Sequence, residues 1–221
     1  MNGRARYGTM DMIGLCEAAF TGREHPMDIW LVRRINGLVG KCFPFDVLMD
    51  FIARFGHMVF VLYGVWLWFG GSGQAVRKQR RTAALMALWG VAVSSLISWG
   101  IGKVWHRPRP FVREERIWNF TGHKASASFP SNHTMNSAVI VMTLFQEKMP
   151  GRWGMAAFAV ILAVSRIFAG IHYATDLLGG AGIAAAVQLG LFRNRSVRAL
   201  AVCLAALSFP AEAFVRSLRK R

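Results

Sequence analysis

The chain has 221 residues, 54% of them hydrophobic, and a formal net charge of +16. In a soluble protein such a charge would favour nucleic acid as a partner, but Phe55 to Val76 and Thr82 to Gly102 contain no Asp, Glu, Lys or Arg. About 20 apolar residues in a helix cross the hydrocarbon core of a bilayer. The composition therefore predicts an all-helical integral membrane protein of one domain, and it argues against a nucleic-acid partner.

The N-terminal segment, residues 1–44, is expected to lie at the membrane surface. Asp28 to Phe43 is too short and too charged for a comfortable span, yet its apolar residues would line much of one helical face. This pattern predicts an interfacial amphipathic helix. The apolar residues on that face are Ile29, Leu31, Val32, Ile35, Leu38 and Val39.

Residues 45–198 are expected to form the transmembrane catalytic domain. Five apolar segments predict five spans. They are Phe55–Gly70, with a start as early as Phe45, then Thr82–Gly102, Thr134–Phe145, Trp153–Ile171 and Leu177–Phe192. Gly and Ala crowd the fifth span, as is typical where helix backbones approach closely in lipid.

The C-terminal segment, residues 199–221, combines an apolar helix with a basic tail. Ala199 to Ala211 is short for a span and carries Pro210, so the sequence leaves a sixth span open. The expected fold is a bundle of about six helices, made of the five spans and the interfacial helix, with this C-terminal helix as a further candidate.

Alternation of spans two to five divides the loops into two groups. One group is short and strongly basic, which is typical of cytoplasmic loops. Its basic residues are Arg77, Lys78, Arg80, Arg81, Lys148, Arg152, Arg193, Arg195 and Arg198. The loops of the other group would then face outward.

Three polar clusters lie at the outward ends of the spans. Charged residues at the edge of a membrane bundle are costly, so they indicate function by default. The clusters are Lys103, His106, Arg107 and Arg109 after the second span, Ser131, Asn132 and His133 before the third, and Ser165, Arg166, His172 and Asp176 between the fourth and fifth. Taken singly, each has another interpretation, such as a helix cap for Ser131 or a membrane-boundary residue for Lys103 and Arg107.

Together the clusters fit phosphoryl transfer. Guanidinium groups match phosphate oxygens, and Ser131 with the start of the third span would form an anion site. His172 and Asp176 are four residues apart, so the carboxylate can reach the ring either along one helical face or across a loop-to-helix corner. An Asp that holds one ring nitrogen leaves the other as a nucleophile, and His133 could act as the general acid. Since no carboxylate cluster or HExxH spacing is present, no metal site or other cofactor is expected.

RPRP at 107–110, PSNH at 130–133 and the segment from Ser165 to Asp176 resemble the three signature motifs of the type 2 phosphatidic acid phosphatase superfamily. The resemblance is greatest to its branch of membrane undecaprenyl-diphosphate phosphatases, which is associated with bacitracin resistance, and it extends from about Asp28 to Phe192. It implies a helical bundle with the core that this superfamily shares with haloperoxidases.

The resemblance also implies roles for single residues. His172 would attack the terminal phosphate and form a phosphohistidine, Asp176 would orient it, and His133 would protonate the departing lipid phosphate. The phosphate-binding residues would be Arg109, Arg166 and Ser131, together with Lys103 and Asn132.

Two positions depart from the superfamily's pattern. Its first motif has a lysine at the position of Gly102, whereas this chain has Lys103, and one residue is about 100° of helix rotation. Its second motif usually has Gly or Asp where this chain has Asn132. His57, His106 and His123 match no motif and are interpreted as ordinary span or loop residues.

The resulting hypothesis is a phosphatase of undecaprenyl diphosphate in the bacterial cytoplasmic membrane, with its site facing outward, that recycles the carrier lipid of cell-wall synthesis. Its partners would be the lipid diphosphate and membrane lipids; the oligomeric state does not follow from the sequence. The alternatives are a phosphatase for phosphatidylglycerophosphate, phosphatidate or lipid A, an anion-binding transporter or channel, and a haloperoxidase.

Overall fold

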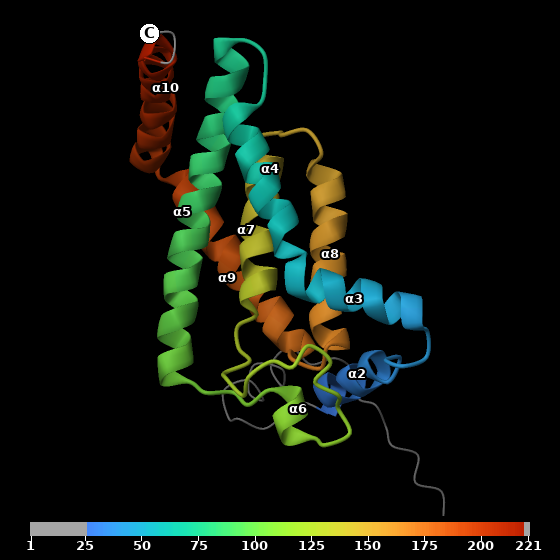
Figure 1. Ribbon diagram of the computed structural model, residues 1–221. Helices are drawn as coiled ribbons and strands as arrows, with labels where there is room; N and C mark the ends of the chain where they lie inside the picture. The colour runs from blue at the N-terminus through green and yellow to red at the C-terminus, as the bar shows by residue number, and fades with distance from the viewer. Residues whose placement is uncertain (1–25, 219–221) are drawn as a thin grey trace, which may run out of the picture.

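The computed structural model describes residues 26–218, and their side chains as far as Phe209. Over this range the chain is helical and contains no strand (Figure 1). The helices are α2 (Pro26–Asn36), α3 (Phe43–Phe55), α4 (His57–Phe69), α5 (Gln74–Val104), α6 (Pro110–Arg113), α7 (Asn132–Gln146), α8 (Arg152–Phe168), α9 (Ala174–Arg193) and α10 (Arg195–Leu218). The part of the predicted N-terminal segment before residue 26 lies outside the described residues.

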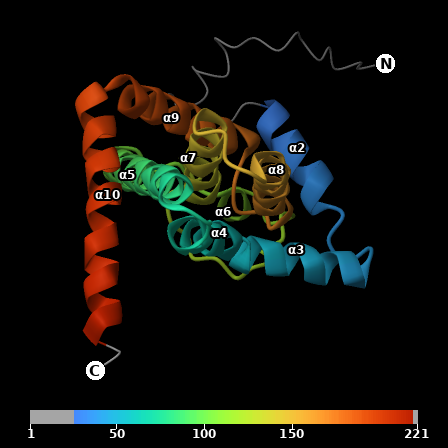
Figure 2. The same ribbon diagram turned by 90° about the horizontal axis from the view of Figure 1, so that it is seen from above.

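Helix α7 forms the centre of the bundle. It packs against α5, α8 and α9, and more lightly against α4, while α10 stands at the edge beside α5 and α9 (Figure 2). Leu144 of α7 packs with Phe60 of α4 and Leu162 of α8 in the largest apolar cluster. On the other side of α7, a Cβ added at Gly90 of α5 would lie 2.4 Å from Oε1 of Gln188 of α9. The absence of a side chain at this position therefore lets α5 approach α9 closely.

Two of the described helices, α5 and α9, are long and apolar enough to cross a membrane. Large apolar side chains on both are exposed, for example Leu96 at 67% and Leu178 at 62%. Such surfaces are unfavourable in water and suit contact with lipid, so these helices indicate a membrane protein. Helices α4, α7 and α8 have 13, 15 and 17 residues, and the five-span and six-helix counts stay predictions.

Several boundaries differ from those predicted. The first span does not begin near Phe45, because α3 and α4 are separate helices that meet at an angle at Gly56 (Figure 1). The helix predicted from Asp28 to Phe43 ends at Asn36, and the chain then turns through Gly40 with φ 83°. A positive φ is strained for most residues but not for glycine, so Gly40, four residues after the last residue of α2, permits the turn that leads to α3.

The basic residues predicted in the loop before the second span lie within α5. This helix begins at Gln74, two turns before Thr82. Arg81 is 1% exposed, and it donates hydrogen bonds to the Trp68 carbonyl at 3.0 Å and to the Ser208 hydroxyl at 2.6 Å. Charge marks where the apolar segment ends, but the helix itself continues past that point because Arg81 finds partners on α4 and α10.

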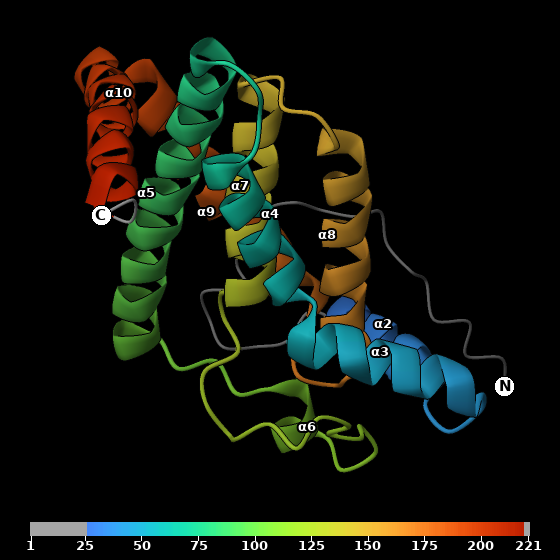
Figure 3. The same cartoon turned by 45° about the horizontal axis from the view of Figure 1, so that its top comes forward.

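The chain order of the helices brings several ends together. The end of α5, the start of α7, the end of α8 and the start of α9 lie at one end of the bundle. The segment that contains α6 lies beyond these ends, on the same side as α2 (Figure 3). The three polar clusters of the sequence come from these helix ends and from this segment.

Candidate active site

The three polar clusters line a single cavity of about 600 Å³. None of the described residues that line it is acidic, and three are cationic, so the cavity suits an anion. The lining residues are Ser95, Ser98, Trp99, Gly102, Lys103, His106, Arg109, His123, Ser126, Ala127, Phe129, Pro130, Asn132, His133, Arg166 and His172. Of the predicted site residues, Ser131 and Asp176 lie outside this lining.

His172, the predicted nucleophile, lies in the loop between α8 and α9 and is 4% exposed. Its Nδ1 lies 3.5 Å from Oδ2 of Asp176, and its Nε2 lies 3.3 Å from Nη1 of Arg109. Because the guanidinium can only donate, Nε2 carries a lone pair and the proton belongs on Nδ1. Burial lowers the pKa of His172 to about 4, so the ring is neutral at pH 7 and the lone pair of Nε2 is the one that faces the cavity.

Asp176 is fully buried in the first turn of α9. Its Oδ2 accepts a hydrogen bond from the Tyr173 N–H at 2.9 Å, as in a capping box, and its Oδ1 accepts one from Arg107 at 2.6 Å. His172 precedes α9, so the two residues meet across a loop-to-helix corner rather than along one helical face. The cap and the contact with His172 use the same carboxylate oxygen.

Arg109 is held against the backbone at the inner wall of the cavity. Nη1 donates to the Ile171 carbonyl at 2.8 Å, Nη2 donates to the Ala127 carbonyl at 3.0 Å, and Nη2 also donates to the Ser126 hydroxyl at 3.1 Å. Burial lowers the pKa of Arg109 to about 10, which leaves the group protonated at neutral pH. A fixed cation next to Nε2 of His172 is suited to stabilise the charge of a phosphate under attack.

Arg166 comes from the last turn of α8 and is 4% exposed. Its Nη1 donates to the carbonyl of Ala53 in α3, and the side chain lines the cavity. Its Nε has no hydrogen-bond partner among the described residues. An arginine that is buried with unused donors leaves hydrogen-bonding capacity for a ligand.

The second cluster is divided between the cavity and the core. Asn132 and His133 line the cavity. Ser131 is fully buried, its hydroxyl lies 3.1 Å from that of Thr134, and its N–H donates to the Asp176 carbonyl at 3.2 Å. Ser131 stands at the N-cap position of α7, and its contacts join α7 to α9 rather than facing the cavity.

The sequence of the chain matches a known protein family. The pattern of the PAP2 superfamily matches residues 83–199, a range that contains all three clusters. The chain belongs to the PAP2 superfamily. It is 30% identical over 168 residues to undecaprenyl-diphosphatase BcrC of Bacillus subtilis, an alignment that covers 76% of this chain and 83% of that protein.

Two solved structures share the PAP2 fold with this chain. Aquifex aeolicus LpxE has a TM-score of 0.64 at 20% identity, over 77% of this chain and 98% of its own. The transmembrane PAP2-type phosphatidylglycerolphosphate phosphatase of Bacillus subtilis has a TM-score of 0.56 at 19% identity, over 80% and 90%. Membership of this family supports a phosphatase, and the two solved structures support its fold.

Lys103 of this PAP2 chain lies in the last turn of α5 and is exposed. Its Nζ lies 5.8 Å from the centroid of the Trp99 ring, and both Lys103 and the neighbouring Gly102 line the cavity. The one-residue shift of this lysine in the sequence therefore does not remove it from the cavity. Its aromatic contact is with Trp99 of the same helix, at the wall of the cavity that His172 also lines.

Three histidines without a motif lie at the PAP2 site. His106 and His123 line the cavity, and the ring of His57 meets that of His133 edge to face at 5.3 Å between centroids. Sequence reasoning missed them because the spacing of single histidines carries no signal. The one available hint was the position of His106 directly before RPRP.

Sequence reasoning also missed the main contact of Arg107. It lies in the same RPRP stretch as Arg109, but its guanidinium turns away from the cavity and binds the carboxylates of Asp176 and Asp28. Burial alone would lower the pKa of Arg107, but these two carboxylates raise it above its ordinary value. The doubled Arg-Pro pair was the signal that could have indicated two separate roles.

The part of the chain that the structure describes contains no group of three or more His, Cys, Asp or Glu side chains placed to hold a metal ion. The cationic groups that this part offers to a phosphate are Arg109, Arg166 and Lys103.

Proposed function

We propose that this PAP2 phosphatase hydrolyses undecaprenyl diphosphate to undecaprenyl phosphate and inorganic phosphate at the outer face of the bacterial cytoplasmic membrane. This reaction would recycle the carrier lipid of cell-wall synthesis and confer bacitracin resistance. The observation that carries the proposal is the placement of His172, with Asp176 on one ring nitrogen and an arginine-lined cavity on the other.

In the first step, Nε2 of His172 attacks the terminal phosphorus. The bond between that phosphorus and the bridging oxygen breaks, and a phosphohistidine forms. Asp176 stabilises the positive ring through the proton on Nδ1. Arg109 and Arg166 hold the oxygens of the transferred group. Burial and the nearby cations lower the pKa of His133 in the absence of substrate, so His133 takes up a proton from solvent when the anionic substrate binds and gives this proton to the bridging oxygen of the departing lipid phosphate.

In the second step, water attacks the phosphohistidine. His133, now neutral, accepts a proton from the water, and the bond between phosphorus and Nε2 breaks. Inorganic phosphate leaves, and His172 returns to its neutral state. His133 thus serves as the acid in the first step and as the base in the second.

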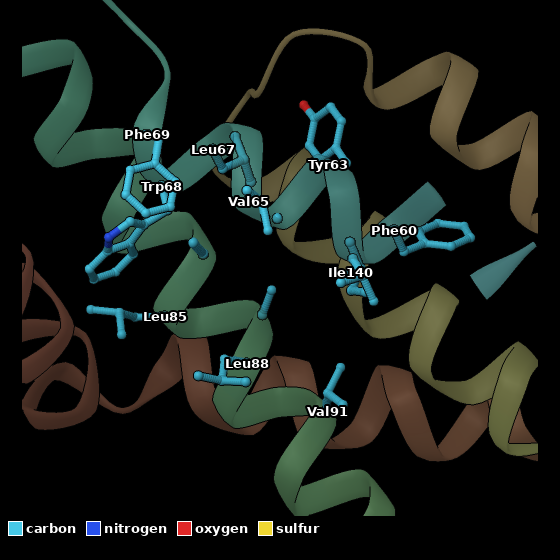
Figure 4. A pocket seen from close by; sticks show the side chains of 14 residues that line it. Phe60, Tyr63, Val65, Leu67, Trp68, Phe69, Leu85, Leu88, Val91 and Ile140 are labelled. Atoms are coloured by element: carbon cyan, nitrogen blue, oxygen red, sulfur yellow. The ribbon is translucent and has the colours of Figure 1, made fainter. Parts of the chain in front are cut away.

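A second cavity of about 410 Å³ between α4 and α5 is evidence for a substrate with a long apolar chain (Figure 4). Leu88 and Val91 line this cavity from α5, and Ser95, Ser98 and Gly102 of the same helix line the candidate active site. Their spacing of three and four residues places them along one helical face. With Ala84 at its far end, this face is about 27 Å long at 1.5 Å per residue.

The two cavities along α5 differ in polarity, as the polar head and the apolar tail of a lipid do. The lining of the α4–α5 cavity is almost entirely apolar, with Phe60 and Leu67 on α4 and Ile140 on α7 (Figure 4). We infer that the phosphates occupy the arginine-lined cavity while the prenyl chain follows α5 toward the opposite end of the bundle. A chain of eleven prenyl units is long enough to use the whole length of this face.

The outward orientation of the site rests on the basic residues at the opposite end of the bundle, such as Lys78 and Lys148. Cysteine labelling tests it in cells, after Cys16, Cys42 and Cys203 are replaced by serine. A membrane-impermeant maleimide should label Lys124→Cys in the loop before α7 without permeabilisation, and Ser196→Cys at the start of α10 only after it. The reverse pattern would overturn the orientation.

The alternatives are separated by a substrate panel. Purified protein in defined lipid vesicles is given undecaprenyl diphosphate, phosphatidylglycerophosphate, phosphatidate and lipid A, and phosphate release is measured. The similarity to BcrC of Bacillus subtilis favours the first substrate. A higher kcat/KM for a phosphatidyl lipid or for lipid A would reassign the substrate.

The same assay with His172→Ala separates an enzyme from an anion-binding transporter. We expect phosphate release to be lost while the protein stays folded in thermal unfolding measurements. A labelled phosphoprotein, acid-labile and base-stable, should be trapped from wild type and not from His172→Ala. Unchanged release from this variant would exclude His172 as the nucleophile.

A further inference from the structure

A buried arginine connects the start of α9 to the first turn of α2. Arg107 is 6% exposed and lies in the loop after α5. Its Nη1 donates to Oδ1 of Asp176 at 2.6 Å, and its Nη2 donates to Oδ2 of Asp28 at 2.9 Å. The guanidinium carbon lies 4.1 Å from the centroid of the Tyr173 ring, which fixes the plane of the group.

Asp28 completes this network from α2 and is 3% exposed. Its Oδ1 accepts a hydrogen bond from the Thr175 N–H at 3.1 Å, and its Oδ2 accepts one from the Thr175 hydroxyl. Arg107 also donates to that hydroxyl at 2.7 Å. A buried carboxylate is costly unless a cation and hydrogen-bond donors compensate it, and here one guanidinium serves two carboxylates.

Helix α2 is fixed in register by polar contacts at both ends of its buried face. Asp28, Val32 and Asn36 are the buried residues of this helix, and they are spaced by four. Asn36 donates to the carbonyls of Trp118 at 2.9 Å and Phe168 at 2.8 Å, and accepts from the Trp118 N–H at 2.9 Å. Directed hydrogen bonds of this kind hold one register, whereas apolar packing alone would tolerate others.

The contact with Arg107 determines which oxygen of Asp176 faces the predicted nucleophile. Oδ1 is occupied by Arg107, so Oδ2 is the atom that meets the Tyr173 N–H and Nδ1 of His172. Without the guanidinium, the carboxylates of Asp176 and Asp28 would remain buried near one another with no cation between them. Their repulsion would turn Asp176 away from His172 or favour its protonated form.

We propose that Arg107 and Asp28 are positioning residues for the phosphatase reaction, and that α2 contributes to the active site through Asp28. They act through Asp176 on the tautomer and orientation of His172, without touching the phosphate. The inference rests on the proposed role of His172 as nucleophile. Helix α2 then has a role in catalysis in addition to any contact that it makes with the membrane.

The test compares variants of the full-length protein in lipid vesicles, with whichever lipid phosphate the wild type hydrolyses. Arg107→Ala and Asp28→Asn remove one member of the network each, and a double variant removes both. Arg107→Lys keeps the charge but lacks the planar fork that directs separate donors to the two carboxylates. Arg33→Ala is the matched control, because it breaks the exposed pair of α2 with Glu114 at 2.7 Å and leaves the network intact.

We expect kcat to fall about 100-fold or more in Arg107→Ala with KM little changed, because orientation of the nucleophile is lost and phosphate binding is not. Asp28→Asn should lower kcat about tenfold, since Arg107 still holds Asp176. Adding Asp28→Asn to Arg107→Ala should raise kcat, because it removes one of two uncompensated carboxylates. Arg107→Lys should lie between wild type and Arg107→Ala, and Arg33→Ala should match wild type.

The pH profile provides a readout that a purely structural role would not change. In Arg107→Ala the acid limb of kcat should move to higher pH, because a carboxylate without its cation takes up a proton more readily. Folded Arg107→Ala and Asp28→Asn proteins with wild-type kcat and pH profile would overturn the inference. If that result is obtained while His172→Ala is inactive, the proposed function still stands. An active His172→Ala would overturn both the proposed function and the inference about Arg107 and Asp28.

Discussion

Oδ2 of Asp176 lies 3.5 Å from Nδ1 of His172, across the corner where the loop after α8 becomes α9. The same oxygen accepts the Tyr173 N–H, so the cap that begins α9 also sets the position of the carboxylate. The geometry gives His172 one protonated nitrogen facing Asp176 and one unprotonated nitrogen facing the cavity. The cap of α9 and the orientation of His172 therefore depend on the same carboxylate oxygen.

Asp176→Asn tests this relationship. The amide has nearly the same shape, but it lacks the charge that stabilises a positive ring and can present N–H to Nδ1, which would favour the wrong tautomer. We expect kcat for phosphate release to fall about 10³- to 10⁴-fold, as for the equivalent change in Ser-His-Asp triads, with a small change in KM. Steady-state assays on folded protein measure this; an unchanged kcat would show that Asp176 does not orient His172.

The burial of His172 predicts a dependence of stability on pH. Its pKa is about 4 in the folded protein and about 6.5 when unfolded, so between these values the unfolded chain binds more protons. Stability from this group is fully present above about pH 6.5 and is lost as the pH falls toward 4, by about 3 kcal/mol at most.

The control for this pH effect is His172→Gln, which cannot titrate. Thermal unfolding in detergent, measured at several pH values, should show wild type losing stability relative to His172→Gln below about pH 6.5. Parallel curves for the two proteins from pH 7 to pH 4.5 would contradict the low pKa of His172.

The meeting of the three clusters could be predicted from the sequence because alternating helices fix which ends share one side of a bundle. Residues as distant as Lys103 and His172 line one cavity for that reason. Helix boundaries were less predictable. Charge marks the limit of an apolar segment, but α5 begins at Gln74 because backbone hydrogen bonds continue where the side chains become polar.

The network around Arg107 could not be predicted from the sequence. Its partner Asp28 is 79 residues away, and nothing in a linear pattern shows which carboxylate a guanidinium meets. Asp28 stands in the first turn of the N-terminal helix, where a carboxylate is favourable for the helix dipole, and nothing in the sequence marks it as buried. For Ser131 the residue type suggested a phosphate contact, whereas the hydroxyl turns to Thr134, one helical turn further on.

Gly170 is predicted to be essential for the loop that carries His172. Its φ is 72°, and a Cβ at this position would lie 2.6 Å from the Trp118 carbonyl oxygen, a backbone atom that cannot easily move. Gly170→Ala should therefore destabilise the protein by about 1–3 kcal/mol or more and lower phosphate release.

The matched control is Gly154→Ala. Gly154 lies in α8, and a Cβ added there meets no atom within 4 Å. This change should be neutral or stabilise the protein by up to about 1 kcal/mol, because alanine favours the helix. Chemical or thermal unfolding of the two variants measures the difference; equal stabilities would show that the backbone at Gly170 is not constrained.

The proposed path of the prenyl chain predicts a change in chain-length preference. Gly64 of α4 lines the apolar α4–α5 cavity, and a Cβ built there meets nothing within 4 Å, so Gly64→Leu would fill space without a clash with the backbone. We expect kcat/KM for undecaprenyl diphosphate to fall about tenfold or more, because the far part of the chain loses its binding surface. For farnesyl diphosphate, whose short chain does not extend along the full face of α5, kcat/KM should stay unchanged.

Gly182→Leu in α9 is the control for this effect. A Cβ at Gly182 also meets nothing within 4 Å, but this residue lines neither the apolar cavity nor the candidate active site. The same leucine there should leave the ratio of the two kcat/KM values as in wild type. Equal losses on both substrates in Gly64→Leu would indicate a general effect on the bundle, and unchanged values on both would place the prenyl chain elsewhere. Only a selective loss on the long substrate supports a path along α5, because only the long chain reaches the level of Gly64.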